Sequence, residues 1–267
     1  MDSTKELTIV IPVRIDSPER KENLDSVVSF FLQNTCATII VMEADKQQQY
    51  FFAGNNDNTL QETNFKERIQ TIFVEDEDPV FYRTRYINQL LKISPTNTVG
   101  IWDADVLIPL PQIIEAIKNI AIGVTLCSPY DGRCIMLSEK GSINARTDVP
   151  RFLDKQEKVE YTPTSRPAVG GAFLVNRDRY VACGGENEHF YGWGPEDAER
   201  IKRMEILEES VTRIKGVLFH LFHPIGANSG LKGNKRDVEN LVALMETCKR
   251  NTEELKEYIS SWGESHN

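Results

Sequence analysis

Short apolar runs alternate with segments of helical periodicity through the N-terminal part of this sequence. Leu7 to Val13 is apolar and β-branched, which predicts a buried strand. Residues 18–33 then place apolar side chains at helical spacing, after Ser17 as a helix cap and Pro18 as the first helical residue. Thr38 to Met42 is a second apolar run. A strand, a crossover helix and a second strand favour parallel pairing, so the sequence predicts an α/β fold with a mostly parallel sheet.

The same alternation continues along the chain. Apolar runs predict further strands at residues 69–74, 97–102, 123–127, 170–175 and 214–222. Helical spacing predicts helices at residues 83–92, 111–119 and 195–207. Residues 44–68 are polar and predict a loop or a weak helix. Residues 138–167 lack periodicity and predict a long irregular connection, of the kind that is usually functional or mobile.

The C-terminal segment at residues 238–262 has the spacing of one long helix. Its apolar stripe consists of Leu241, Leu244, Met245, Cys248, Leu255 and Ile259. Such a stripe most often packs against the core, and we expect that arrangement here. A helix that docks on a partner or lies on a membrane surface is the alternative.

The chain has 267 residues and a formal net charge of -9. An acidic chain gains no general attraction to nucleic acid or anionic lipid, so we expect no nucleic-acid binding. Five widely spaced cysteines without a Cys-x-x-Cys pair argue against disulfides and a structural zinc site. The sequence starts with polar residues, and its apolar runs are too short to span a bilayer. We expect a cytoplasmic protein without stable membrane insertion, and peripheral association with the inner face of the membrane stays open.

An acidic pair follows the strand predicted at residues 97–102. Asp103 and Asp105 stand where that strand ends, and ligands of open α/β sheets bind outside the carboxyl ends of the strands. Hard divalent cations prefer carboxylate oxygens, and a bound diphosphate can complete their coordination. The pair therefore favours a cation that bridges to the diphosphate of a nucleotide sugar. An ordinary solvated turn is the alternative.

Two glycines flank a tryptophan in Gly192-Trp193-Gly194, just before an acidic helix start. Glycine lets the backbone turn tightly around the large ring. Glu196 and Asp197 follow at the N-terminus of the predicted helix, where the macrodipole favours ionised carboxylates. A ring that stacks on a pyranose and an acid that binds or deprotonates a hydroxyl suit a sugar site. The alternative is a capped helix with a buried tryptophan.

Two histidines, His220 and His223, lie at the end of the apolar run at residues 214–222. In a regular strand, positions three apart face opposite sides, so a bend is needed to bring both side chains to one site. Imidazole suits Mn²⁺ and other transition metals better than Mg²⁺. With the acidic pair, the histidines indicate a transition-metal site, and packed or surface histidines are the alternative.

These three clusters, in this order, resemble the β-1,4-galactosyltransferase family and its bacterial relatives among the inverting GT-A glycosyltransferases. The resemblance extends from about residue 7 to residue 224. It is strongest where the chain looks like the family's Gly-Gly…Gly-Trp-Gly-x-Glu-Asp pattern, at residues 170–173, 184–185 and 192–197. The family's Asp-x-Asp and nucleotide-binding segments resemble residues 103–109, 11–14 and 81–88.

The resemblance implies a single GT-A catalytic domain over residues 1–267, with a Rossmann-like, mostly parallel central sheet flanked by helices. Its nucleotide-sugar-binding half would end at about residue 110, its acceptor and metal half would cover about 111–225, and a helix would follow at about 235–263. The implied reaction moves a hexose, galactose or N-acetylgalactosamine, from a UDP-sugar to a hydroxyl of a saccharide or glycolipid acceptor. It would proceed with inversion, with Mn²⁺ or another divalent cation, in bacterial polysaccharide biosynthesis.

The resemblance also implies roles for single residues. The metal ligands would be Asp105, His220 and His223, with His220 where animal enzymes carry a methionine. The donor would be bound by Arg14, Arg83, Asp103, Gly171 and Trp193. The acceptor would contact Trp193, Glu196 and Asp197, and Asp197 would be the general base.

Two places depart from the family's pattern. Ala198 and Glu199 follow the Glu-Asp pair, where family members often carry more aspartates, which leaves acceptor binding open. Ala168 stands where the animal galactosyl enzymes carry a tyrosine that limits the 2-substituent of the donor sugar. Because alanine leaves room for an N-acetyl group, we expect UDP-N-acetylgalactosamine to serve as well as, or instead of, UDP-galactose.

Two other classes of function compete with this one. A nucleotidyltransferase acting on a sugar phosphate is expected to show a glycine-rich phosphate loop after the first strand, but residues 11–17 contain no glycine. A non-catalytic nucleotide-sugar-binding module is expected to have lost its acid or metal residues, whereas Asp103, Asp105, Asp197 and His223 are present. The sequence therefore favours the glycosyltransferase over both other classes.

Overall fold

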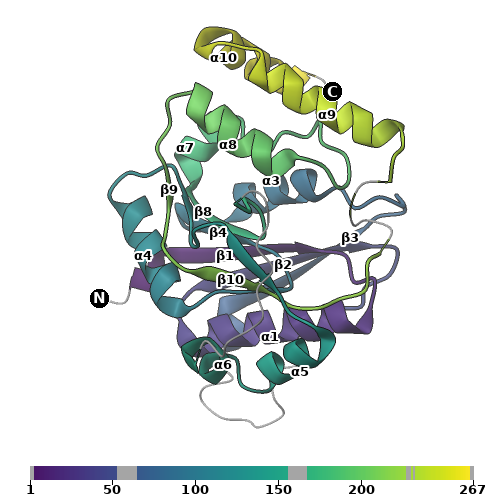
Figure 1. Ribbon diagram of the computed structural model, residues 1–267, viewed down its shortest axis with the longest axis vertical. Coiled ribbons are helices and arrows are strands. Elements are labelled where there is room, and N and C mark those ends of the chain that lie inside the picture. The colour runs from purple at the N-terminus through teal and green to yellow at the C-terminus, as the bar shows by residue number, and fades with distance from the viewer. Residues whose placement is uncertain (1–2, 53–64, 156–166, 227–229, 231, 265–267) are drawn as a thin grey trace.

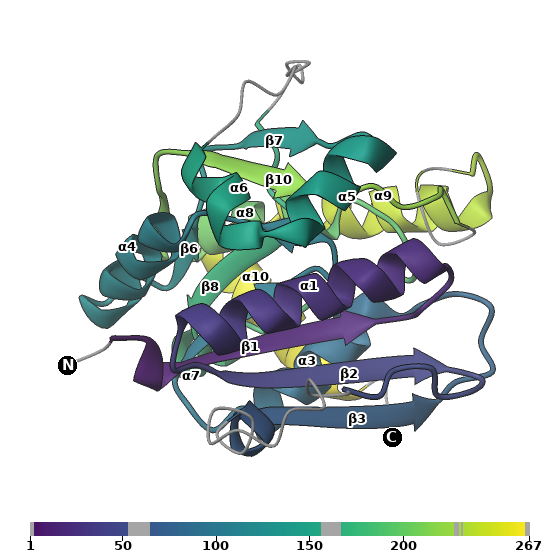
Figure 2. The same cartoon turned by 90° about the horizontal axis from the view of Figure 1, so that it is seen from below.

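The computed structural model describes residues 3–52, 65–155, 167–226, 230 and 232–264. A seven-stranded sheet lies at its centre, in the strand order β3-β2-β1-β4-β8-β6-β9 (Figures 1 and 2). Its strands are β1 (Leu7–Val13), β2 (Thr38–Asp45), β3 (Ile69–Glu75), β4 (Thr98–Trp102), β6 (Leu126–Ser128), β8 (Ala172–Asn176) and β9 (Val211–Arg213). A three-stranded sheet in the order β5-β10-β7 consists of β5 (Val106–Leu107), β7 (Arg133–Met136) and β10 (Val217–His220).

Parallel pairing dominates the central sheet. Strand β1 pairs with β2 and β4, and β2 pairs with β3, all in parallel. Every residue of β1 is buried, because helices cover both faces of the sheet. Strand β8 is inserted antiparallel between β4 and β6, and β6 pairs in parallel with β9. The predicted α/β fold with a mostly parallel sheet is confirmed.

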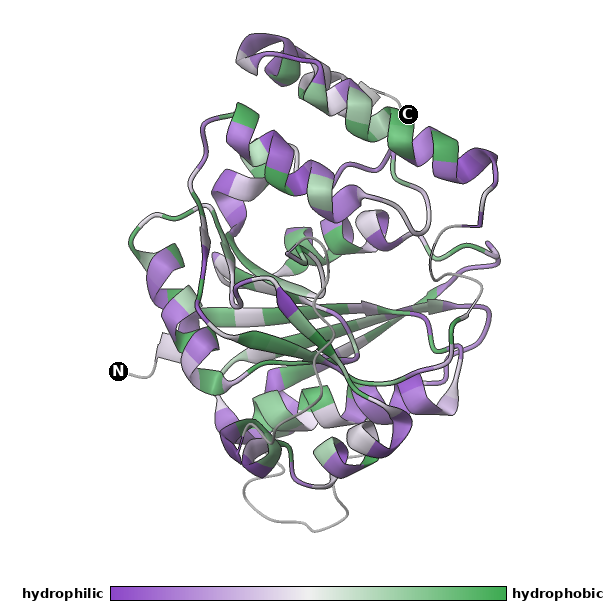
Figure 3. Cartoon of the chain, viewed as in Figure 1, coloured by the Kyte–Doolittle hydropathy of each residue, from purple (hydrophilic) through white to green (hydrophobic). Residues whose placement is uncertain are grey.

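Helices cover the sheet on both faces (Figure 1). Helices α1 (Pro18–Asn34) and α4 (Leu110–Ala121) pack on one face, and α3 (Arg83–Ile93), α7 (Arg177–Ala182) and α8 (Glu196–Ile206) on the other. Figure 3 shows strongly hydrophobic central strands between helices that carry hydrophilic residues. The predicted start of α1 is confirmed, since the Ser17 side chain accepts a hydrogen bond from the Arg20 amide and Pro18 opens the helix.

The prediction of an irregular connection at residues 138–167 is wrong for residues 139–155. Two short helices, α5 (Glu139–Thr147) and α6 (Val149–Lys155), occupy this stretch. The Ser138 side chain caps α5, and Pro150 lies in the first turn of α6, where a missing N–H costs nothing. Helices this short show little periodicity in sequence. Residues 156–166 lie outside the described residues, as do 53–64 of the segment expected to be loop or weak helix.

The single C-terminal helix is also wrong, because the structure has two helices, α9 (Lys235–Cys248) and α10 (Thr252–Ser260), packed outside α8 (Figure 1). Helix α9 ends at Cys248 with Lys249 as its C-cap, and Asn251 caps α10 through a capping box. The stripe expected to face the core is largely exposed in α9, at Leu241 and Met245, while Leu255 of α10 is buried. Helix α9 turns small and polar residues toward α8 instead, so polar contacts replace the expected apolar ones.

The remaining differences concern short elements. Strand β10 ends at His220 rather than at residue 222, and β6 starts at Leu126 rather than at residue 123. The sequence did not predict β5, β7, β9, α7 or the short 3-10 helices η1 (Ser3–Glu6) and η2 (Ser261–Glu264). Among the described residues, no helix is long and apolar enough to cross a membrane.

Candidate active site

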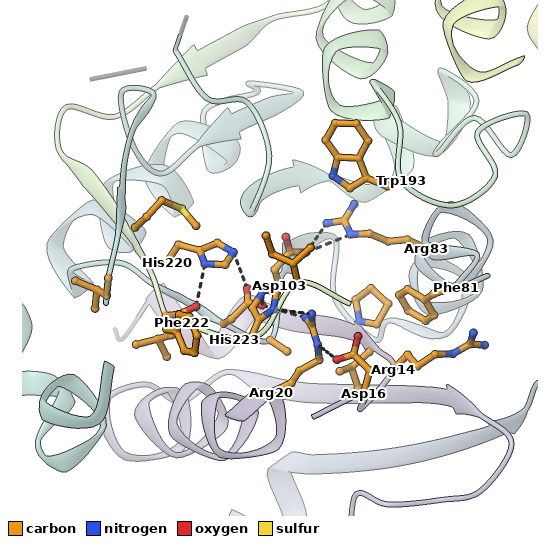
Figure 4. Close-up of a pocket in the computed structure, with 18 residues that line it drawn as sticks. Arg14, Asp16, Arg20, Phe81, Arg83, Asp103, Trp193, His220, Phe222 and His223 are labelled. Carbon is orange, nitrogen blue, oxygen red and sulfur yellow. Dashed lines mark hydrogen bonds and ion pairs between the residues drawn. The ribbon is translucent and has the colours of Figure 1, made fainter. Parts of the chain in front are cut away.

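A cavity of about 400 Å³ opens at the carboxyl ends of β1 and β4 (Figure 4). Its walls come from the end of β1 and start of α1, the turn after β4, the start of α3, the chain at the end of β10, and the loop before α8. The predicted site residues that line it are Arg14, Arg83, Asp103, Asp105, Trp193, His220 and His223. The structure thus gathers segments far apart in sequence at the edge where α/β sheets bind ligands.

The turn after β4 is fixed by main-chain hydrogen bonds. The Asp103 amide donates to the carbonyl of Gly171 at 2.8 Å, and the Val106 amide donates back to the Asp103 carbonyl at 3.3 Å. Gly171 has φ +85°, a conformation that favours glycine. The predicted donor residue Gly171 is not among the residues that line the cavity, so in this structure it acts on the site by holding Asp103.

The predicted metal residues converge on one point. The Nε2 atom of His220 lies 3.4 Å from Oδ1 of Asp105, and Nε2 of His223 lies 3.2 Å from Oδ2. The bend that the sequence required is present, because β10 ends at His220 and the next residue, Leu221, donates its amide to the carbonyl of Asp105 at 2.8 Å. The three side chains offer ligand atoms within 4.8 Å of one another. One carboxylate and two imidazoles fit a transition-metal ion such as Mn²⁺.

Arg20, which the sequence did not single out, lies against this cluster. Its Nη1 contacts Oδ2 of Asp105 and its Nη2 contacts Nδ1 of His223, both at 3.1 Å, while Nε donates to Asp16 at 2.8 Å (Figure 4). Burial would raise the pKa of Asp105, but His220, Arg20 and His223 hold it below its ordinary value. The available sequence signal was an arginine in the first turn of a helix that starts beside the carboxyl end of β1.

Arg83 joins the cavity to the start of α8. Its Nε and Nη2 donate to Oδ1 of Asp103 at 3.2 and 2.7 Å, as Figure 4 shows. Its Nη1 lies 4.0 Å from Oδ1 of Asp197. The guanidinium therefore contacts the acidic turn on one side and faces the predicted base on the other.

Asp197 and Glu196 open α8 but do not belong to the residues that line the cavity. Oδ1 of Asp197 accepts a hydrogen bond from Nη1 of Arg200 at 2.6 Å. Burial would raise the pKa of Asp197, but Arg200 and Arg83 hold it below its ordinary value. Glu196 is 8% exposed, and its Oε2 has no hydrogen-bond partner among the described residues. Burial and the Asp197 charge raise its pKa to about 8. Two adjacent carboxyl groups thus have opposite protonation preferences.

The Trp193 side chain is 43% exposed and lines the cavity, so the alternative of a buried tryptophan is wrong. Its backbone is held by buried Asn240 of α9, whose Nδ2 donates to the Trp193 carbonyl at 3.0 Å and to the Tyr191 carbonyl at 3.2 Å. Oδ1 of Asn240 accepts from the Tyr191 amide at 3.1 Å. Helix α9 therefore fixes the tryptophan segment, which the sequence did not indicate.

Arg14 and Ala168 do not point into the cavity as their expected roles at the donor would require. The Arg14 guanidinium points away from Asp103 (Figure 4) and is engaged by the carbonyls of Ala44 and Asp78 and by the Asp76 carboxylate. It therefore ties the end of β1 to β2 and to the segment after β3, although it lines the cavity. Ala168 is half-buried, does not belong to the lining residues, and donates its amide to the Gly132 carbonyl at 2.9 Å.

Comparison with known proteins confirms the family resemblance. Residues 151–224 match the family model described as the N-terminal domain of galactosyltransferase. The chain is 38% identical over 64 residues to human β-1,4-galactosyltransferase 7 and 37% identical over 62 residues to the mouse protein. These matches cover 24% and 23% of this chain and 16% of each relative, so the chain aligns with only a small part of the relatives it matches.

Solved structures share the fold over most of the chain. The catalytic domain of Drosophila β-1,4-galactosyltransferase 7 superposes with a TM-score of 0.51 at 15% identity, covering 86% of this chain and 76% of that one. The mannosyltransferase PcManGT from Pyrobaculum calidifontis gives a TM-score of 0.53 at 15% identity, covering 95% and 69%. Glucosyl-3-phosphoglycerate synthase from Mycobacterium tuberculosis gives 0.50 at 13% identity, covering 91% and 80%. The chain therefore has the fold of the GT-A glycosyltransferases.

Proposed function

We propose that this protein is an inverting glycosyltransferase that moves a hexose from a UDP-sugar to a hydroxyl of a saccharide or glycolipid acceptor. The observation that supports this most is the convergence of Asp105, His220 and His223 in the cavity that also contains Arg83 and Asp103. A carboxylate–imidazole cluster beside two arginines suits a diphosphate bound through a transition-metal ion. The Drosophila enzyme that shares this fold was solved with manganese, UDP-Gal and xylobiose.

On the donor side, the chain supplies metal ligands and positive charge. A cation held by Asp105, His220 and His223 would neutralise the diphosphate and stabilise the charge that develops on the leaving UDP. Arg20, beside Asp105, and Arg83, beside Asp103, add fixed hydrogen-bond donors to the same region. Arg14 supports the donor site in this proposal by holding the chain near Phe81, whose ring lies 5.6 Å from its guanidinium carbon.

On the acceptor side, Asp197 takes the proton of the attacking hydroxyl. That oxygen forms a bond to C1 of the donor sugar as the bond from C1 to the UDP oxygen breaks, which inverts the anomeric configuration. The exposed Trp193 ring stacks on the acceptor sugar, and Glu196 binds a sugar hydroxyl. A carboxyl group with a raised pKa donates a hydrogen bond at neutral pH, while the ionised neighbour accepts a proton.

A UDP-release screen with Mn²⁺ tests the proposal. UDP-sugars are offered with a panel of acceptor saccharides, and the anomeric configuration of the product is read by NMR. We expect metal-dependent UDP release and an inverted linkage. Release of pyrophosphate from a nucleoside triphosphate and a sugar phosphate would instead establish the nucleotidyltransferase, and donor binding without turnover would establish the non-catalytic module.

The base is tested by Asp197→Asn, which keeps the shape of the side chain. We expect UDP binding to persist and transfer to fall by about 10²–10⁴. Asp178→Asn, in the first turn of α7, is the matched control and retains full turnover. Near-normal turnover of Asp197→Asn would exclude Asp197 as the base.

The donor's 2-substituent is tested at Ala168. The proposal follows from the family resemblance, in which a larger residue at this position limits that substituent. We expect the wild type to accept UDP-N-acetylgalactosamine and Ala168→Tyr to favour UDP-galactose. Strict rejection of UDP-N-acetylgalactosamine by the wild type would contradict this part of the proposal and leave sugar transfer itself intact.

A further inference from the structure

A buried ionic network is attached to Asp197 through Arg200. Arg200 is 1% exposed and Glu186 is 2% exposed. Nε and Nη2 of Arg200 donate to the two oxygens of Glu186 at 2.8 and 2.6 Å, and Nη1 donates to Oδ1 of Asp197 at 2.6 Å. The Tyr180 hydroxyl donates to Oε1 of Glu186 at 2.6 Å. Such a network is costly to bury unless its groups are paired, and here they are.

The guanidinium of Arg200 has one defined position in this network. Its forked Nε–Nη2 edge is occupied by Glu186, which leaves Nη1 for Asp197. The Phe173 ring lies 4.0 Å from the guanidinium carbon and covers its face. Lysine carries the same charge but lacks the planar fork, so it cannot contact both carboxylates in this way.

This contact distinguishes the two oxygens of Asp197. Oδ1 is bound by Arg200, while Oδ2 has no hydrogen bond to any residue that the structure describes. Oδ2 lies against Gly170, where an added Cβ atom would be only 2.1 Å away. One oxygen is therefore used for orientation, and the other remains available to accept a proton.

Glu186 also controls how strongly Arg200 neutralises Asp197. A guanidinium bound to Asp197 alone would cancel its charge and weaken it as a proton acceptor. With Glu186 on the opposite edge, the three groups together carry a net negative charge, so Arg200 orients Asp197 without fully cancelling its strength as a proton acceptor.

We propose that Arg200, anchored by Glu186, is a positioning residue that orients Asp197 through Oδ1 and leaves Oδ2 to receive the acceptor's proton. This inference rests on the proposed function, in which Asp197 is the general base. It assigns a role to a buried pair that lines no part of the cavity and that no family motif marks.

Two variants shift the titration of Asp197 in opposite directions. In Arg200→Leu/Glu186→Leu, apolar side chains replace the buried pair, a change that is often neutral for stability. Asp197 then loses its hydrogen-bonded cation and keeps only Arg83, whose Nη1 lies 4.0 Å from Oδ1. We expect its titration and the acid limb of kcat/KM to move about one to three pH units upward. Glu186→Gln keeps Arg200 but removes the competing carboxylate, so both should move downward.

The control is the neighbouring buried pair on α8. Arg203→Leu/Glu199→Leu removes Arg203 and Glu199, which pair with each other, are 0% and 1% exposed, and form no ion pair with Asp197 in the described part of the chain. We expect it to lower the melting temperature without moving the pH profile. If Arg200 did not reach Asp197 in solution, its removal would give the same result as this control.

The closing measurement is NMR titration of the Asp197 carboxyl carbon in each variant, together with the pH profile of kcat/KM. Shifts of opposite sign in the two Glu186 variants support the inference. Titration midpoints that stay with the wild type and the Arg203 control overturn it. Because the titration needs no turnover, absence of transfer in the wild type would reject the proposed function while the titration still decides whether Arg200 holds Asp197 ionised.

Discussion

Arg83 donates two hydrogen bonds to one oxygen of Asp103, from Nη2 at 2.7 Å and from Nε at 3.2 Å. Its third nitrogen, Nη1, is buried, has no hydrogen-bond partner among the described residues, and lies 4.0 Å from Oδ1 of Asp197. Glu186, Arg200, Asp197, Arg83 and Asp103 thus form a row of alternating charge from the buried interior to the cavity. The donor and acceptor sides of the site are electrostatically connected through Arg83.

Substitution of Arg83 should therefore affect both sides. In Arg83→Ala, the unpaired buried nitrogen and the contact with Asp103 are lost together, and we expect kcat/KM to fall by about 10²–10³. The measurement is initial rate with donor and acceptor varied separately. Lys92→Ala, at the exposed end of α3, is the control and should leave kcat/KM unchanged. A loss of less than threefold would place Arg83 outside the reacting region.

Removal of the metal cluster should be detectable without turnover. Mn²⁺ that binds only the folded state stabilises it by about 2.7 kcal/mol at a concentration a hundred times its dissociation constant. We expect Mn²⁺ to raise the melting temperature of the wild type but not of Asp105→Ala or His223→Ala. Asp154→Ala, an exposed change on α6, should keep the full effect. Equal shifts in all proteins would mean that the ion binds elsewhere.

Glu196 should make folding stability depend on pH. Its pKa is raised from 4.5 to about 8 by burial and by the Asp197 charge. Between these values the unfolded chain has lost the proton and the folded protein still holds it, so stability falls as pH rises through this window. Glu196→Gln has no proton to lose in this window. We therefore expect its free energy of unfolding, relative to that of the wild type, to rise by roughly a few kcal/mol between low pH and pH 8. Urea unfolding at several pH values measures the free energy of unfolding of both proteins. If the two depend on pH in the same way, the prediction is wrong.

Gly170→Ala should displace Asp197. An added Cβ atom would lie 2.1 Å from Oδ2, far inside van der Waals contact. Since a misplacement of about 1 Å can cost about 100-fold in rate, we expect kcat to fall on that order while UDP affinity is kept. Gly141→Ala in α5, where the nearest atom would be 3.3 Å away, is the control. An unchanged kcat in Gly170→Ala would show that Asp197 tolerates the shift.

Asn240→Ala should loosen the tryptophan segment. The substitution removes the hydrogen bonds to the main chain of Tyr191 and Trp193, and groups left buried without partners cost about 1–3 kcal/mol. We expect faster hydrogen exchange in residues 191–194 and a higher KM for the acceptor. Val242→Ala, an exposed change on the same helix, should leave both unchanged. Exchange that matches the wild type would mean that α9 does not hold this segment.

Elements with strong local patterns were predictable. The apolar run from Leu7 to Val13 predicted a buried strand, and Ser17 with Pro18 predicted the start of α1. Helices α5 and α6 were missed because they are too short to show a period. The exposed stripe of α9 was misjudged because periodicity indicates a helix face without identifying what the neighbouring element presents to it.

The sequence by itself determined the α/β class, the acidic pair at the end of β4, and the need for a bend between His220 and His223. It also placed two carboxyl groups at the start of α8, because spacing and helix caps are local properties. Only the tertiary structure decided which charges lie within hydrogen-bonding distance: Arg20 beside Asp105, Arg83 between Asp103 and Asp197, and Arg200 behind Asp197. These side chains come from elements far apart in the sequence, and packing of those elements sets the distances between them. No local sequence pattern encodes such distances.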